Sequence, residues 1–331
     1  MLPKLDSVHE PESVNAALKL LARPGVRMMP LYGGPELFDD LHVAAEVEEV
    51  ILLAGLGLDQ VHVEPGSDWR IGAMVTLAAL PEAEAFSRQY RALPWVLRMD
   101  TQIALFEAME RAYPLNLRAM WTFGAVVAHA GATSPLLVTL LALGAQVEVA
   151  GEGATPLAQY LPRRARTDLV TAVVLPFGGE AQESAPVAYE AVARTPADAP
   201  IVCAAARVVV EGGAIAAAWL ALGGAAETAI RAGVVEAALA GRPATAESVG
   251  AALGALDALE PPADFRGSAE YRREMAKVTA RRALLRAMGL REATRQIRSV
   301  RGITKDENHQ AGSLPRPLQK TPASPPPAYP T

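Results

Sequence analysis

The sequence predicts an α+β protein of two domains followed by a tail. Three observations lead to this expectation. Short apolar runs bounded by turn residues alternate with amphipathic stretches over residues 1–178, and a long hairpin followed by helical stretches occupies residues 185–288. Residues 289–331 are first basic and then rich in Pro and Ser. A chain of 331 residues is long enough for two domains, each with its own core.

The first part of the chain begins with an amphipathic pattern over Ser13–Ala22, which predicts a helix that ends at Arg23-Pro24-Gly25. Tyr32-Gly33-Gly34-Pro35 is then a turn signal, with Pro35 well placed at the start of a further helix. Helical sequence dominates residues 81–113. Apolar runs predict strands at residues 26–31, 50–53, 60–64, 69–74, 145–149 and 169–175, with a hairpin turn at 64–68.

The second part begins after a polar connection, residues 179–184, which we take as the domain boundary. A strand is expected at residues 188–193, and the Glu211-Gly212-Gly213 turn predicts a hairpin over residues 201–222. Helices are expected at residues 227–240, 245–259 and 268–288, the last with Tyr271, Met275, Val278 and Leu285 on its apolar face and Arg and Lys opposite. The tail, 289–331, shows no periodic apolar pattern and predicts disorder.

Composition excludes several classes of protein. The net charge of −5 gives no basis for nucleic acid binding, and no uninterrupted apolar run reaches the length of a membrane span. The N-terminus lacks the apolar core of a signal peptide, so a cytoplasmic protein is expected. A single cysteine, Cys203, excludes an intrachain disulfide, a cysteine-held iron–sulfur cluster and an all-cysteine zinc site. No G-x-S-x-G, H-E-x-x-H or P-loop motif is present, so we expect no catalytic or metal-binding residues.

The most informative stretch runs from Arg118 to Leu143, RAMWTFGAVVAHAGATSPLLVTLLAL. It starts as a turn, crosses small residues around His129 and becomes an apolar helix, a backbone suited to an anionic ligand. The stretch resembles the second flavin-binding loop of the FAD-binding medium subunit of molybdenum hydroxylases, the carbon monoxide dehydrogenase and xanthine dehydrogenase family. The positions that agree with that loop are Arg118, Thr122, Gly124, Ala128, His129 and Ala130.

Further matches to this family occur in order along residues 5–287. Y-G-G-P-E-L at 32–37 stands for the family's A-G-G-T-D-L, and R-I-G-A-M-V-T at 70–76 is similar to its R-I-G-A-L-T-T. D-L-V-T-A-V-V-L-P at 168–176 resembles the strand that ends the flavin domain. A-L-G-G at 221–224 and G-S-A-E-Y-R-R at 267–273 match motifs of the C-terminal domain.

The resemblance implies a two-part FAD-binding domain of the vanillyl-alcohol-oxidase (PCMH) type, followed by a small antiparallel sheet with a helical bundle. It implies a flavoprotein that passes electrons from iron–sulfur clusters of a small subunit through FAD to an external acceptor. The partners would be a molybdopterin-binding large subunit and a small subunit with two such clusters. The residues implied to hold FAD are Gly33, Gly34, Glu36, Thr122, Gly124 and His129.

The two flavin loops also depart from the family pattern. Pro35 has no N–H for a phosphate, Ala125 replaces a glycine, and Val126 and Pro135 stand for an asparagine and an aspartate. Tyr32 and Trp121 replace small residues. Each lost hydrogen bond to a charged or amide group is worth about 1–3 kcal/mol. The alternative is therefore a non-catalytic structural subunit of the same fold that has lost FAD binding.

Plainer interpretations remain open for individual residues. The Gly33–Gly34 pair is also what a strand-to-helix turn requires, and His129 among alanines is typical of a packed polar residue. Cys203 is expected in the core, and Asp198 in a solvated loop. A third function is a vacated cleft that binds another small ligand, lined by Tyr32, Trp121 and Phe123.

Overall fold

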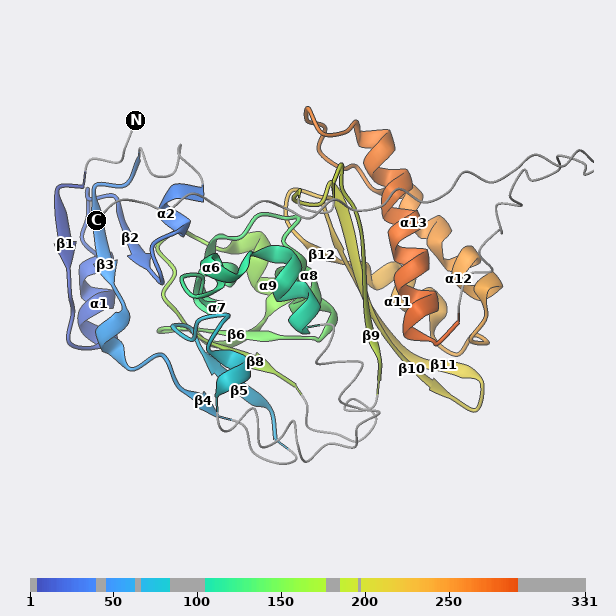
Figure 1. Ribbon diagram of the computed structural model, residues 1–331, viewed down its shortest axis with the longest axis horizontal. Coiled ribbons are helices and arrows are strands. Elements are labelled where there is room, and N and C mark those ends of the chain that lie inside the picture. The colour runs from blue at the N-terminus through green and yellow to red at the C-terminus, as the bar shows by residue number, and fades with distance from the viewer. Residues whose placement is uncertain are drawn as a thin grey trace, which may run out of the picture. The chain divides into compact units, whose positions relative to one another are not determined.

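The computed structural model describes residues 5–39, 46–62, 67–83, 105–176, 185–195 and 198–290. These residues form three separate β-sheets with helices packed on them (Figure 1). Two of the sheets precede residue 177, and the third follows residue 184. The mixture of helices and antiparallel and parallel strands confirms the predicted α+β class.

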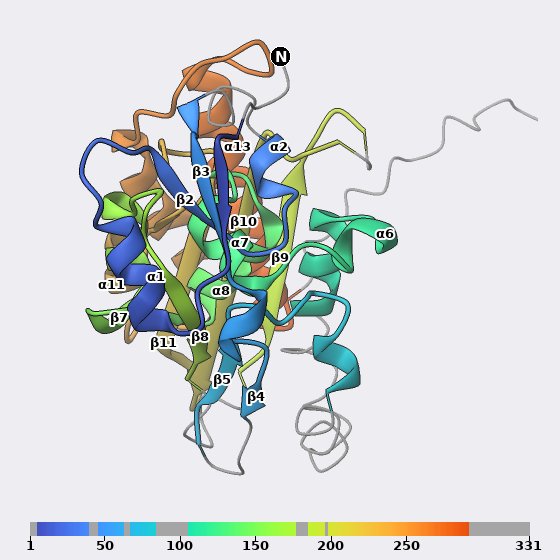
Figure 2. The ribbon, with the colours of Figure 1, turned by 90° about the vertical axis from the view of Figure 1, so that its left-hand side faces the viewer.

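The first sheet is parallel, with its strands in the order β1 (Ser7–His9), β3 (Glu49–Leu52) and β2 (Met28–Leu31). Helix α1 (Val14–Leu21) links β1 to β2 and lies beside this sheet (Figure 2). Its N-cap is Ser13, whose hydroxyl accepts a hydrogen bond from the Ala16 N–H at 3.2 Å. The helix is where the amphipathic pattern predicts it. Strand β1 was not predicted, because three residues carry too little periodicity.

The second sheet is antiparallel and has the order β4 (Val61–His62), β5 (Trp69–Gly72), β8 (Val170–Leu175), β6 (Gln146–Val149) and β7 (Gly153–Pro156). The strands predicted at residues 60–64, 69–74, 145–149 and 169–175 are thus confirmed where the structure describes them. The other elements before residue 177 are α2 (Glu36–Asp39), η1 (Ala54–Leu56), η2 (Leu80–Glu82), a helix at 105–112, α6 (Leu115–Arg118), α7 (Phe123–His129), α8 (Pro135–Ala142), α9 (Leu157–Tyr160) and η3 (Leu161–Arg163).

The third sheet is antiparallel, in the order β12 (Ile230–Arg231), β11 (Ala214–Gly223), β10 (Val202–Glu211) and β9 (Val187–Val192). The predicted hairpin is the β10–β11 pair, which turns through Gly212 and Gly213, both with positive φ. One face of the sheet is covered by helices, as Figure 1 shows. They are α11 (Gly233–Leu239), α12 (Ala246–Ala252), η4 (Leu253–Ala258) and α13 (Ala269–Ala287).

Alternate residues of β10 belong to two different hydrophobic cores. Cys203 and Ala205 pack into the core that contains α7 and α8, whereas Val202 and Ala204 pack against α13. At the end of β11, Gly223 meets the loop before α8: a Cβ there would lie 2.6 Å from the Ala132 carbonyl oxygen. The glycine of the A-L-G-G motif is therefore required by close packing, and Cys203 is a core residue as predicted.

The helix predicted at residues 227–240 is shorter than expected. Ile230 and Arg231 instead form β12 at the edge of the third sheet, and α11 starts at Gly233. The edge is held by Glu236, whose carboxylate accepts hydrogen bonds from the Leu220 N–H at 2.8 Å and from the Arg231 guanidinium. Pairing with an existing sheet outweighs the local helix propensity of this Ala-rich segment.

The last helix is confirmed, and its predicted apolar face is confirmed in part: Leu285 is buried and Met275 packs against the core, whereas Tyr271 is 40% exposed. Half of the buried positions of α13 are alanines, among them Ala276, Ala280 and Ala283. These small side chains let the helix approach the sheet closely. Arg272, predicted on the solvated basic face, is 2% exposed and donates to the Ile201 carbonyl oxygen at 2.8 Å.

Several expectations lie partly or wholly outside the described residues. These are the proposed boundary at 179–184, much of the helical stretch at 81–113 and the hairpin turn at 64–68. The tail from residue 291 onward is likewise not described, so the division at 1–178, 185–288 and 289–331 stays a prediction. Within the described ranges, no helix combines the length and apolarity that a membrane crossing needs. The same ranges hold no group of three or more His, Cys, Asp or Glu side chains suited to a metal ion.

Candidate functional site

Two loops that are distant in sequence lie against each other. The first loop, residues 32–36, connects β2 to α2, and what we call the second loop, residues 120–126, comprises the turn before α7 and the first turn of that helix. A Cβ on Gly33 would lie 2.0 Å from the Met120 carbonyl oxygen, and a Cβ on Gly124 would lie 2.4 Å from Cδ1 of Tyr32. The fold thus brings together the two segments that the sequence marks as flavin loops.

The glycines of both loops are required by the backbone. Gly34 has φ +101°, a conformation that residues with a Cβ rarely adopt. Gly33 and Gly124 have no room for a side chain, because the opposite loop occupies that space. The strand-to-helix turn therefore accounts for Gly34, and the close approach of the second loop accounts for Gly33, with or without a ligand.

Tyr32 fills the space beside the second loop. Its side chain is fully buried, and its ring lies against Gly124 and, tilted, 5.8 Å from the His129 ring centroid. Its hydroxyl accepts a hydrogen bond from the Val170 N–H at 2.7 Å and donates to the Asp168 carbonyl oxygen at 3.0 Å. Burial raises the pKa of Tyr32 well above its ordinary value, so the phenol stays protonated.

Glu36 turns back onto the first loop. Its side chain is 3% exposed, and Oε1 accepts from the Tyr32 N–H at 2.5 Å and from the Gly33 N–H at 3.1 Å. The other carboxyl oxygen, Oε2, is buried and finds no hydrogen-bond partner among the described residues. A carboxylate of the chain itself therefore binds two N–H groups of this loop.

The N–H groups of the second loop are also bonded within the chain. Phe123 donates to the Val75 carbonyl oxygen at 3.1 Å, and Gly124 donates to that of Ala73 at 2.8 Å. Thr122, which is 1% exposed, is the N-cap of α7: its hydroxyl accepts from the Ala125 N–H at 3.1 Å. Val126 then begins the helical ladder by donating to the Thr122 carbonyl oxygen.

His129 ends α7 next to an arginine. The Arg164 guanidinium donates to the carbonyl oxygens of Val127 at 3.2 Å and Ala130 at 2.9 Å, where a cation also complements the helix dipole. Burial, together with the positive charges of Arg164 and Arg166, lowers the pKa of His129 to about 4. The imidazole is thus neutral at pH 7, and its Nε2 is buried with no partner in the described part of the chain. This environment is that of a packed polar residue.

The residues that depart from the family pattern lie in the core. Ala125 and Val126 are fully buried within α7, so position 125 has a helical backbone and needs no glycine. Pro135 occupies the first turn of α8, where its missing N–H costs nothing. Trp121 is 2% exposed and stacks on Tyr113, with ring centroids 4.6 Å apart. Tyr32, Trp121 and Phe123 are packing residues here, which does not support the third function.

These observations test whether the two loops fit the pyrophosphate of FAD. Gly33 and residues 123–126 direct their N–H groups to acceptors of the chain itself. Tyr32 fills the space between the loops and a buried carboxylate stands in the cradle. In this arrangement the residues present do not fit the group. The roles predicted for Gly33, Gly34, Glu36, Thr122, Gly124 and His129 in cofactor binding therefore stay predictions.

Sequence reasoning identified Tyr32 as an oversized residue but missed where its hydroxyl goes. The partners, Asp168 and Val170, lie 136 and 138 residues away, and no local pattern connects them. The sequence signal for this role was that Tyr32 stands where the family pattern has a small residue.

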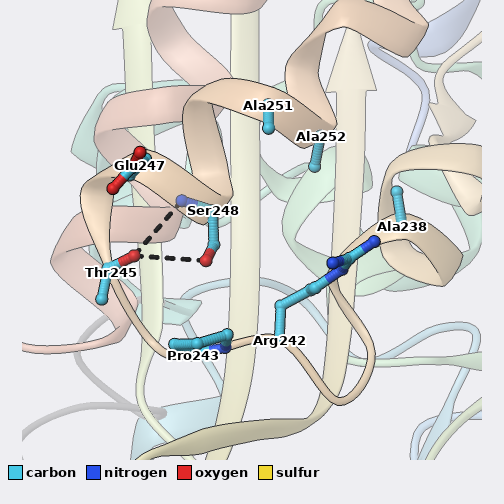
Figure 3. A pocket seen from close by; sticks show the side chains of 8 residues that line it. All are labelled: Ala238, Arg242, Pro243, Thr245, Glu247, Ser248, Ala251 and Ala252. Atoms are coloured by element: carbon cyan, nitrogen blue, oxygen red, sulfur yellow. Dashed lines mark hydrogen bonds between the residues drawn. The ribbon is translucent and has the colours of Figure 1, made fainter.

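Two cavities lie away from the loops. One, of about 460 Å³, is formed between the end of α11 and α12, and Figure 3 shows its lining of Ala238, Arg242, Pro243, Thr245, Glu247, Ser248, Ala251 and Ala252. The other, of about 320 Å³, is lined in part by Arg111, Tyr189, Arg194 and Asp198. Asp198 forms an ion pair with Arg194 at 3.5 Å, in agreement with a loop acid at the surface.

Comparison with known proteins agrees with this architecture over both parts of the chain. Residues 4–178 match the family model for the FAD binding domain in molybdopterin dehydrogenase. Residues 187–287 match the model for the CO dehydrogenase flavoprotein C-terminal domain. The carbon monoxide dehydrogenase medium chain of Afipia carboxidovorans is 30% identical over 298 residues, which are 87% of this chain and 98% of the relative.

Solved structures show the same fold. The reconstituted CO dehydrogenase from Oligotropha carboxidovorans matches with a TM-score of 0.72 and 27% identity, covering 88% of this chain and 100% of that chain. The CO dehydrogenase from Hydrogenophaga pseudoflava that lacks the Mo-pyranopterin moiety matches with a TM-score of 0.73 and 26% identity, over 87% and 99%. Quinoline 2-oxidoreductase from Pseudomonas putida 86 matches with a TM-score of 0.69 and 23% identity, covering 87% of this chain and 98% of that chain. At this identity the match shows the fold alone. The chain therefore belongs to the FAD-binding medium subunits of the carbon monoxide dehydrogenase type of molybdenum hydroxylase.

Proposed function

We propose that this chain is the medium subunit of a molybdenum hydroxylase-type complex in the cytoplasm. Its partners would be a molybdopterin-binding large subunit and a small subunit with two iron–sulfur clusters. The observation that carries the proposal is correspondence over the full length: the chain covers 98% of a CO dehydrogenase medium chain. Both the loops of the first part and the sheet and helices of the second part are retained in one chain.

The role that family membership supports for such a subunit is electron relay through FAD. Electrons would pass from the clusters of the small subunit to the flavin and then to an external acceptor, while the large subunit carries out substrate chemistry. This chain would hold the flavin in position and set the charges around it, since its sequence contains no catalytic motif of its own. The family model over residues 4–178 is the support for this version.

One specific observation favours the alternative, a structural subunit without FAD. The first loop is closed by Tyr32 and Glu36, and the second loop has its N–H groups bonded within the chain. In this version the chain keeps the fold of a medium subunit and would dock its partners without carrying FAD. The comparisons favour the relay, and the geometry of the two loops supports the structural version best.

Membership of a complex is tested by co-expression with the large and small subunits encoded in the same genome. A tagged form of this chain should co-purify with both in a fixed ratio, and the complex should contain molybdenum and iron. A tagged chain that stays monomeric when both partners are folded and loaded would contradict the proposal. This outcome does not depend on flavin content.

A further inference from the structure

Side chains of the protein itself occupy the space between the two loops, where members of the family would hold the phosphates of the cofactor. The first loop must satisfy its N–H groups, because a buried N–H without a partner is unfavourable. Glu36 does so for Tyr32 and Gly33 through a single oxygen, Oε1. With the side chain 3% exposed, this carboxylate stands inside the loop rather than in solvent.

Tyr32 occupies the adjoining space. Its ring prevents even a methyl group at Gly124, since a Cβ there would lie 2.4 Å from Cδ1 and 2.7 Å from Cε1 of the ring. Its hydroxyl reaches the start of β8, where it bonds the Val170 N–H and the Asp168 carbonyl oxygen. The side chain is therefore fixed at both ends, by packing at the ring and by hydrogen bonds at the hydroxyl.

Displacing either group has a definite physical cost. If the Tyr32 ring moved out, the Val170 N–H would lose its partner and a fully buried aromatic side chain would enter water. If a phosphate approached the first loop, it would compete with Glu36 Oε1 for the N–H groups of Tyr32 and Gly33. Both effects oppose binding of a dinucleotide.

We propose that the Tyr32 side chain acts as an internal plug that takes the place of FAD between the two loops. The ring excludes the cofactor by volume, while Glu36, at a position where the family pattern also has a carboxylate, bonds the N–H groups of the first loop. Tyr32 is the decisive element, because it contacts the second loop and β8 at once. This inference deepens the structural version of the proposed function and assigns the loss of flavin to a named residue.

The test separates the plug from the other departures in the loops. A loop-restored variant carries Pro35→Thr, Ala125→Gly and Val126→Asn but keeps Tyr32. A second, matched variant carries the same changes plus Tyr32→Ala. FAD binding is measured for the full chain of each by quenching of flavin fluorescence, with thermal melts as a check of folding. The wild type and a Tyr113→Ala variant, which lacks a different aromatic side chain, are titrated in parallel.

The plug predicts that the wild type, Tyr113→Ala and the loop-restored variant do not quench FAD fluorescence. The variant that also carries Tyr32→Ala should bind at least about ten times more tightly than the loop-restored variant, a change of about 1.4 kcal/mol. Equal binding by the two matched variants, including equal absence of binding when both are folded, would overturn the proposal. Stoichiometric binding of FAD by the wild type would overturn it as well, and that readout does not require any variant to fold.

The two proposals fail in different ways. A wild type that binds FAD and also assembles with its partners would remove the plug and leave the medium subunit intact. A chain that binds no FAD and does not assemble would remove the proposed function and leave the plug.

Discussion

The Tyr32 hydroxyl accepts a hydrogen bond from the Val170 N–H at 2.7 Å, which joins the first loop to strand β8. The two residues are 138 positions apart, and both lie in the core of the flavin domain. A buried phenol in this position stabilises the first loop, the second loop and β8 together. Stability measurements can therefore detect the same contacts that the FAD titrations address.

Replacing Tyr32 by Phe keeps the ring and removes the hydroxyl. The Val170 N–H and the Asp168 carbonyl oxygen then lose their partner, and an unsatisfied buried group costs about 1–3 kcal/mol. We expect the free energy of unfolding in urea to fall by that amount. Tyr271→Phe, at a residue that is 40% exposed, is the control and should change it by less than about 0.5 kcal/mol. Equal effects of the two substitutions would show that the hydroxyl of Tyr32 is not bonded as described.

Replacing Gly124 by Ala tests the packing of the two loops. The new Cβ would lie 2.4 Å from the Tyr32 ring and 2.8 Å from Cβ of Ala73, so the loops must separate. Overpacking of this kind costs about 1–3 kcal/mol. Gly131→Ala is the matched control, because no atom lies within 4 Å of a Cβ there. In a double-mutant cycle, Tyr32→Ala should remove the part of the Gly124→Ala effect that comes from the ring and leave the part that comes from Ala73, and strictly additive effects would contradict the contact with Tyr32.

The stability of the chain should depend on pH through His129. Its pKa is lowered to about 4 in the folded chain from an ordinary value of 6.5, so the unfolded chain binds a proton in this interval that the folded chain does not. The stability contributed by the neutral imidazole is complete above pH 6.5 and falls as the pH drops toward 4. The total loss is at most about 3 kcal/mol.

The measurement is urea unfolding at steps between pH 4 and pH 7. His129→Gln should flatten the profile in this interval, whereas the exposed-residue variant His62→Gln should leave it unchanged. An identical slope in wild type and His129→Gln would show that other groups cause the dependence.

Arg272 should be the most sensitive basic residue of α13. Its guanidinium donates to the Ile201 carbonyl oxygen and forms an ion pair with Asp264 at 2.7 Å, and the side chain is 3% exposed. The arginine also holds the pKa of Asp264 below its usual range. Arg272→Met leaves the buried Ile201 carbonyl oxygen without its donor, which costs about 1–3 kcal/mol, while water still reaches Asp264, whose side chain is 33% exposed.

The control for this substitution lies on the same helix. Arg286 is 52% exposed and has longer ion-pair distances, 3.4 Å to Glu190 and 3.8 Å to Glu107. Arg286→Met should therefore cost less than about 1 kcal/mol. Thermal or urea unfolding of the two variants under the same conditions compares them. Similar losses would mean that burial of Arg272 does not decide its contribution.

The elements with strong local signals could be predicted from the sequence. Ser13 caps α1 where the amphipathic pattern begins, and the Gly212–Gly213 turn joins β10 to β11. Elements that depend on distant partners could not. Ile230 and Arg231 form a strand because β11 offers an edge, and Arg272 is buried because Asp264 and the Ile201 carbonyl oxygen surround it.

The candidate site divides in the same way. The glycines and Thr122 could be placed at the two loops by their motifs, and the structure brings these loops into contact. The roles of Tyr32 and Glu36 could not be predicted, because they depend on which N–H groups each side chain reaches. A loop motif predicts the backbone conformation of the loop. Whether a ligand can bind there depends on which side chains fill the space between the loops and which N–H groups already have acceptors.

The most direct test of the plug in its natural setting is the flavin content of the complex purified with its large and small subunits. Its absorbance spectrum is recorded, and the supernatant after heat denaturation is assayed for released FAD. The account predicts iron–sulfur and molybdenum signals with no released FAD, even after incubation with an excess of the cofactor. Release of FAD in near-stoichiometric amount would contradict it, and the chain would then be an electron-relaying flavoprotein in which the Tyr32 side chain gives way to the cofactor.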